Sequence, residues 1–352
     1  MKGLAKKETS NQDSLQKLKK DIREKTIGNL YVFFGEETFL KTHYLELIRR
    51  QRTDEITESF NYRKLTGENF TMQDLIEGVE AVPMMAEYTL TVVDDVDIWK
   101  LNEDDRARLG ELISDIPDYC TLIFTYETVE WKLDGRYKKL CDAIRQNGEI
   151  VEFPKQEARD LIPWIGRHFA AAGKRIAPSL CSYLIEITDG TMTTLAGEIG
   201  KICAFSGAEE ITKSDIDAVV EPALDAIIYE ISEQLSAGEP GKALMKLTQV
   251  LKMQEEPISI LGTIGAHFRR LSTARVLQDN GRPYTELMPL YRMSDWAARK
   301  TMQSASRLST RFLEKTAALI VETDRKMKTS TDDPKRLLEV LLLEISREAR
   351  NG

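Results

Sequence analysis

Short β-rich runs alternate with stretches of helical periodicity over about residues 28–153, and this alternation restricts the fold more than any other feature of the sequence. The β-rich runs are Tyr31–Phe34, Phe60–Leu65, Leu90–Val93, Thr121–Tyr126 and Ile150–Phe153. Between them, helical periodicity covers about 37–52, 71–80, 103–115 and 134–147. Strands that alternate with helices of this length form βα units, in which helices cover both faces of a parallel sheet. We therefore predict an α/β domain over residues 28–153.

The strand signal disappears after this region, and only helical patterns follow. Residues 154–221 predict a small α-helical domain, and the Glu221-Pro222 step marks its end because the residue before a proline avoids the helical conformation. Residues 222–352 predict an α-helical bundle. Residues 1–27 are polar and rich in lysine, so we expect a frayed helix or a polar tail there.

The cysteines and histidines suggest neither a metal centre nor a disulfide framework. The chain has three histidines, and its four cysteines lie about 20 to 40 residues apart without a C-x-x-C pair. No apolar run is long enough to cross a bilayer, so we expect a cytoplasmic protein with isolated, buried thiols. The first 220 residues carry a net charge of −10 and the remainder +2, which argues against a large nucleic-acid surface in the N-terminal part. The cysteines are Cys120, Cys141, Cys181 and Cys203.

The first strand runs into a loop that resembles a phosphate-binding motif. The segment from Gly35 to Thr42 reads GEETFLKT. Against the pattern G-x-x-x-x-G-K-[ST], Gly35, Lys41 and Thr42 match, and Leu40 stands where the second glycine belongs. The strand that ends in Asp94 and Asp95 resembles the acidic strand end that holds Mg²⁺ in such proteins. The match indicates a P-loop type of fold, although a plain strand-to-helix turn remains an alternative.

The same loop is poorly suited to bind a nucleotide. Leu40 places a branched side chain where glycine would allow backbone amides to approach phosphate, and Glu36 and Glu37 add negative charge beside a polyanion. The sequence also lacks G-x-S-x-G and H-E-x-x-H motifs. We therefore expect an ATPase-like fold with a degenerate, non-functional nucleotide loop, no catalytic residues, no metal and no cofactor. An active P-loop ATPase remains an alternative.

Four segments in this order resemble the delta subunit of the bacterial DNA polymerase III clamp loader: residues 31–40, 82–97, 189–205 and 323–345. The resemblance implies a degenerate AAA+-like domain, a small helical domain and a C-terminal helical collar. It also implies a subunit of the polymerase holoenzyme without catalysis of its own, which binds the ring-shaped sliding clamp (beta) and helps open it for loading on primed DNA. The implied partners are the tau/gamma and delta-prime subunits, joined through the collar, and primer-template DNA within the assembly.

An apolar connection precedes the third predicted strand and is the candidate for clamp binding. In the family that this chain resembles, the exposed tip at this place grips the clamp, which assigns clamp contact to Val82, Pro83, Met84 and Met85. Proline restrains the backbone, and flexible methionine side chains suit a hydrophobic groove on a partner. The alternative is that Met84 and Met85 pack under the sheet. A helical scaffold protein that binds no clamp therefore also remains possible.

The predicted bundle contains a basic stretch between His267 and Arg311, with nine Lys or Arg residues against three acids. Such a surface attracts phosphates, and an interleaved aromatic residue can stack on an unpaired base. The resemblance implies that the collar lies near DNA, which makes Trp296, Arg299 and Lys300 the DNA-proximal candidates. A solvated helix face with ion pairs is the alternative, and we expect His267 itself at the surface.

Overall fold

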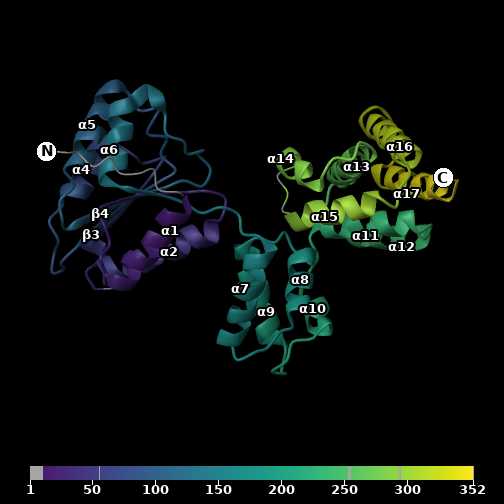
Figure 1. Cartoon of the computed structure of the whole chain (residues 1–352), viewed down its shortest axis with the longest axis horizontal. Coiled ribbons are helices and arrows are strands. Elements are labelled where there is room, and N and C mark those ends of the chain that lie inside the picture. The colour runs from purple at the N-terminus through teal and green to yellow at the C-terminus, as the bar shows by residue number, and fades with distance from the viewer. Residues whose placement is uncertain (1–10, 55, 253–254, 292, 294, 352) are drawn as a thin grey trace. The chain divides into compact units, whose positions relative to one another are not determined.

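The computed structural model describes residues 11–351 apart from 55, 253–254, 292 and 294. Contacts between Cα atoms divide the chain into two compact units, Met1–Gln156 and Glu157–Gly352, which we call unit 1 and unit 2. Figure 1 shows the strands confined to the first and helices throughout the second. Each unit is described separately below.

Unit 1 contains a five-stranded parallel sheet in the order β2-β3-β4-β1-β5. All five predicted strands are confirmed, with ends that differ by at most two residues. The strands are parallel because at least one helix lies between each pair of successive strands and returns the chain to the end of the sheet where the previous strand began. The strands are β1 Leu30–Phe34, β2 Tyr62–Thr66, β3 Thr89–Asp94, β4 Cys120–Thr125 and β5 Glu149–Glu152.

Helices cover both faces of this sheet (Figure 1). Side chains of a strand alternate between its faces, and β1 shows this directly: Leu30 and Val32 belong to one buried apolar cluster, Tyr31 and Phe33 to the other. The first cluster packs against α4, α5 and α6, and the second against α1 and α2. The helices of unit 1 are α1 Asn11–Glu24, α2 Thr38–Arg52, α3 Glu58–Asn61, α4 Met72–Glu80, α5 Glu103–Ser114, the 3₁₀ turn η1 Gly135–Tyr137 and α6 Lys138–Asn147.

Helix α1 lies in the segment expected to be a frayed helix or a polar tail, and it is packed. Leu18 and Ile22 are buried in the second apolar cluster, and Lys17 forms an ion pair with Glu149 on β5. The sequence conceals this packing because few apolar residues, spaced three or four positions apart, form a narrow stripe among many lysines.

Unit 2 is helical throughout its described residues (Figure 1). Its first helices are α7 Ala158–Ala171, α8 Pro178–Ile187, α9 Met192–Phe205 and α10 Lys213–Val219, and the boundary expected at Glu221 follows them inside this unit. One large apolar cluster then joins the remaining helices. These are α11 Leu224–Ser236, α12 Pro240–Lys252, α13 Pro257–Asp279, the 3₁₀ turn η2 Tyr284–Glu286, α14 Leu287–Tyr291, α15 Asp295–Ala305, α16 Thr310–Thr329 and α17 Pro334–Asn351.

The four cysteines are free thiols, three of them buried, whereas Cys203 is half-buried. Burial raises the pKa of each thiol, which keeps the reactive thiolate form rare. Among the described residues, none of the helices combines the length and the apolar character that crossing a membrane requires.

Candidate functional site

The candidate clamp-binding residues lie in an exposed connection between the end of α4 and the start of β3. Val82 is 73% exposed, Met84 54% and Met85 93%, while Pro83 is half-buried. The two methionines therefore do not pack under the sheet, and their side chains add nothing to the core of unit 1. We call residues 82–85 the apolar tip.

The local sequence explains why the chain leaves the helix and projects here. Thr71 caps the start of helix α4, since its side chain accepts a hydrogen bond from the amide of Asp74. Pro83 follows the helix end and has no amide to continue it. Met85 has a φ of 54°, a left-handed conformation that costs a residue with a Cβ about 1 kcal/mol. Such strain in an exposed connection is typical of functional sites.

A second exposed apolar segment lies beside the apolar tip. The side chain of Asn61, at the end of α3, forms hydrogen bonds with both backbone groups of Met84. Its neighbour Phe60 is 62% exposed, and Ile56, in the turn before α3, is exposed as well. Phe60 and Asn61 also line a cavity of about 270 Å³ together with Ala81, the first residue after α4.

Sequence reasoning missed this neighbour because it placed Phe60 in a strand. Strand β2 begins two residues later, at Tyr62, and Phe60 belongs to the short helix α3. The exposure of an aromatic residue at the start of a predicted strand has no local signal. The hydrogen bonds of Asn61 join positions 23 residues apart, which no short pattern reveals.

The degenerate nucleotide loop is occupied by contacts within the chain. Gly35 has a φ of 109°, and a Cβ placed there would lie 2.5 Å from the carbonyl oxygen of Phe153. The next turn is tied to the same carbonyl, which accepts a hydrogen bond from the amide of Glu37 at 2.9 Å. The glycine of the motif thus permits close approach to the end of β5. Leu40 is half-buried against the second apolar cluster, and Thr42 is exposed.

The lysine of the motif also faces its own chain. Lys41 is buried, and its ammonium group donates a hydrogen bond to the carbonyl oxygen of Tyr126 at 2.7 Å. Burial lowers the pKa of Lys41, because desolvation disfavours its charged form. The hydrogen bond of this ammonium group joins α2 to the residue that follows β4.

The two acids at the end of β3 likewise form their contacts inside unit 1. Asp94 accepts a hydrogen bond from the hydroxyl of Thr125 at 2.7 Å and forms an ion pair with Lys64 at 2.7 Å. Asp95 accepts from the backbone amides of residues 127–129. Burial alone would raise the pKa of Asp95, but these hydrogen bonds outweigh it and lower that pKa. Asp94 therefore joins the ends of β2, β3 and β4, and Asp95 holds the loop after β4, at the end of the sheet where a P-loop enzyme would bind its nucleotide and Mg²⁺.

Most of the basic stretch in unit 2 is neutralised by ion pairs. Several of the acidic partners lie outside the stretch, so the count of nine basic residues against three acids overstates its charge. Exposed pairs of this kind contribute about 0–1 kcal/mol each to stability. The pairs are Arg270–Asp225, Arg275–Asp279, Arg282–Glu286, Arg299–Asp295, Lys300–Glu186 and Arg307–Glu233. Arg292 lies outside the described residues.

The three DNA-proximal candidates share helix α15 but differ in their surroundings. Trp296 belongs to this helix, and its side chain lies outside the described part of the structure. Arg299 is exposed, pairs with Asp295 at 2.7 Å and lies over the ring of Tyr284. Lys300 is half-buried and turns toward the protein interior, where it pairs with Glu186 on α8. Of these two side chains, Arg299 is the more exposed to solvent, although its Nε is paired with Asp295.

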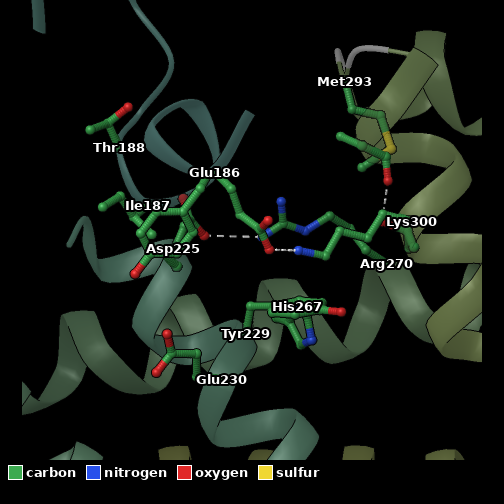
Figure 2. A pocket seen from close by; sticks show the side chains of 14 residues that line it. Glu186, Ile187, Thr188, Asp225, Tyr229, Glu230, His267, Arg270, Met293 and Lys300 are labelled. Carbon is green, nitrogen blue, oxygen red and sulfur yellow. Dashed lines mark hydrogen bonds and ion pairs between the residues drawn. The ribbon is translucent and has the colours of Figure 1, made fainter. Parts of the chain in front are cut away.

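Lys300 lines a pocket of about 250 Å³ between α8, α11, α13 and α15 (Figure 2). Figure 2 shows two ion pairs across it, Lys300 with Glu186 and Arg270 with Asp225. His267 also lines this pocket and is partly buried, with a hydrogen bond to Ser232, so its expected place at the surface is wrong. Burial, and then the nearby charge of Arg270, lowers the pKa of His267 to about 4.

Comparison with known proteins places these features in one family. Two family models match the chain, the one described as "DNA polymerase III, delta subunit" over residues 31–154 and the one for the C-terminal domain of the DNA polymerase III delta subunit over residues 225–345. The DNA polymerase III subunit delta of Bacillus subtilis (strain 168) is 24% identical over 336 residues, which cover 93% of this chain and 95% of that protein.

Solved structures agree on the fold. The Bacillus subtilis DNA clamp loader delta protein (YqeN) has a TM-score of 0.66 and 23% identity, and the match covers 95% of this chain and 99% of that one. It shares the parallel α/β sheet followed by helices. Because the two family models correspond to the N-terminal and C-terminal parts of the same subunit and match in the expected order, the chain belongs to the DNA polymerase III delta subunit family.

Proposed function

We propose that this chain is the delta subunit of the DNA polymerase III clamp loader, which binds the sliding clamp and helps open the ring for loading on primed DNA without hydrolysing ATP itself. The observation that carries the proposal is the exposed apolar tip in a chain of this family. Its three exposed side chains take little part in the packing of unit 1, and burying each in a hydrophobic groove contributes about 1.5–3 kcal/mol.

Opening a ring requires no hydrolysis by the subunit that binds it. A tip that binds the opened or strained clamp more tightly than the closed one shifts the equilibrium by the difference in affinity. ATP binding and hydrolysis by neighbouring tau/gamma subunits would then control when the tip is available. The contacts of two residues support this division of labour: Lys41 of the degenerate nucleotide loop and Asp95 after β3 are already bonded to backbone groups of the chain.

An active P-loop ATPase is the less supported function. It would require Lys41 to leave the carbonyl of Tyr126 and a phosphate to approach past Leu40.

We further propose that the subunit lies in the cytoplasm and is joined to tau/gamma and delta-prime subunits through its C-terminal helices. Exposed apolar side chains such as Val340 and Leu343 on α17 are available for that association. Primer-template DNA would meet Arg299 rather than Lys300.

The test is binding of the purified full-length protein to the sliding clamp of the same organism, without nucleotide. We expect a micromolar or tighter Kd that the double variant Met84→Ala/Met85→Ala weakens by about a hundredfold, or about 2.7 kcal/mol. The matched control is Val340→Ala/Leu343→Ala, which also removes two exposed apolar side chains but leaves the tip intact. It should bind as the wild type does.

Two other results of the clamp-binding test would change the proposal. A folded wild-type chain that shows no affinity for the clamp contradicts the proposal and favours a helical scaffold. Binding that survives the double substitution keeps the function but moves the contact to another part of unit 1.

A further inference from the structure

The segment that carries the apolar tip is fixed at both of its ends. At its start, the hydroxyl of Tyr119 donates a hydrogen bond to the carbonyl oxygen of Glu80 at 3.1 Å. At its end, the guanidinium carbon of Arg52 lies 3.9 Å from the centre of the Tyr88 ring. Between them, over residues 83–87, the described part of the chain contains no hydrogen bond from one backbone group to another.

One buried side chain holds the middle of this segment. Asn61 is only 2% exposed, and its Nδ2 donates to the carbonyl oxygen of Met84 at 2.9 Å. Its Oδ1 accepts from the amide of Met84 at 2.8 Å. The carboxamide therefore pairs with both backbone groups of one residue, as a neighbouring strand would. Nδ2 also donates to the carbonyl of Thr57 at 3.2 Å, which fixes the amide relative to α3.

We propose that Asn61 is the positioning residue of the apolar tip: by holding the backbone of Met84, it sets the left-handed turn that projects Met85 into solvent. The part that concerns the clamp rests on the proposed function above. A tip without this anchor would have to be ordered when the partner binds, and ordering backbone and side chains reduces affinity. Asn61 orders it beforehand without touching the partner.

The chemistry of this anchor restricts which residue can serve. The site needs a donor and an acceptor on one planar group, because Met84 offers both a carbonyl and an amide. Alanine supplies neither, and serine supplies one hydroxyl on a shorter side chain. Asn29 offers a matched control in the same unit, since its Nδ2 also holds a loop through two carbonyls, those of Pro117 and Cys120 at 2.9 and 3.0 Å.

The first experiment measures amide hydrogen exchange in the full-length protein and needs no partner. We expect Asn61→Ala to raise the exchange rate of the Met84 amide by about tenfold or more, while amides within β3 stay protected. Asn29→Ala should leave the Met84 amide unchanged. Asn61→Ser replaces Asn61→Ala if the alanine variant does not fold. An unchanged exchange rate of the Met84 amide in the folded Asn61 variant overturns the proposal.

The second experiment measures affinity for the sliding clamp in a double-mutant cycle. We expect Asn61→Ala to weaken binding by about tenfold in the wild-type background and by much less in the Met85→Ala background, since positioning acts through the side chain that is positioned. Asn29→Ala should bind as the wild type does. Equal losses in both backgrounds, or the same loss in Asn29→Ala, would indicate general destabilisation and contradict the proposal. If the wild type itself fails to bind the clamp, the proposed function falls, whereas exchange at Met84 still decides whether Asn61 positions the tip.

Discussion

Met85 is exposed and conformationally strained, so its side chain adds little to the stability of the fold. Its side chain is 93% exposed and its φ of 54° is unfavourable for a residue with a Cβ. We predict that Met85→Gly leaves the stability of the protein equal or higher by about 1 kcal/mol, since glycine tolerates this φ, yet weakens clamp binding by about tenfold or more. Thermal unfolding and a clamp-binding titration measure the two effects.

Met72→Ala is the control for stability, because Met72 is buried and its truncation should cost about 2–5 kcal/mol. A Met85→Gly variant that loses stability would show that the exposed side chain supports the fold.

Helix α1 shows at the scale of an element how sparse apolar residues can attach a polar segment to a core. Leu18 is buried beside Tyr31 and Phe33 of β1, whereas Lys19 is exposed. We predict that Leu18→Ala lowers the free energy of unfolding by about 2–5 kcal/mol and that Lys19→Ala changes it by less than about 0.5 kcal/mol. Urea denaturation of the two variants makes the comparison. Equal effects would mean that α1 is not attached to unit 1 in solution.

At the scale of the whole molecule, we expect the pocket around His267 to make the stability of unit 2 depend on pH. The pKa of His267 is about 4 in the folded protein against an ordinary value of 6.5, because burial and the charges of Arg270 and Lys300 outweigh the attraction of Asp225. The unfolded chain therefore binds more protons between these values. Stability from this group is complete above pH 6.5 and is lost as the pH falls toward 4.

We predict that unit 2 loses at most about 2.5 kcal/mol of stability between pH 7 and pH 4.5 through His267, with partial exposure to water reducing that figure. Hydrogen exchange in α13, compared with β1 of unit 1, measures the loss unit by unit. His267→Gln removes the titrating group and should flatten the dependence in α13 while leaving β1 unchanged. An unaltered pH dependence in His267→Gln would show that carboxylates elsewhere in unit 2 are responsible.

Much of the candidate site could be predicted from the sequence, because its members are close in the chain. Val82 to Met85 form one apolar run between a helix pattern and a strand pattern, so their position at a connection needed no long-range information. The degenerate loop from Gly35 to Thr42 was visible for the same reason. The surroundings of Lys300 were not, since its partner Glu186 lies 114 residues away.

The sequence by itself determined which elements form and in what order. The alternation of apolar and polar positions sets strand or helix locally, and β1 to β5 therefore appear where the pattern predicts them. Only the tertiary structure decided which polar groups meet: Asn61 with Met84, Lys41 with Tyr126, and His267 inside a pocket. The physical reason is that periodicity arises from burial of one face of an element, whereas a hydrogen bond between distant residues depends on how packed elements bring their atoms together.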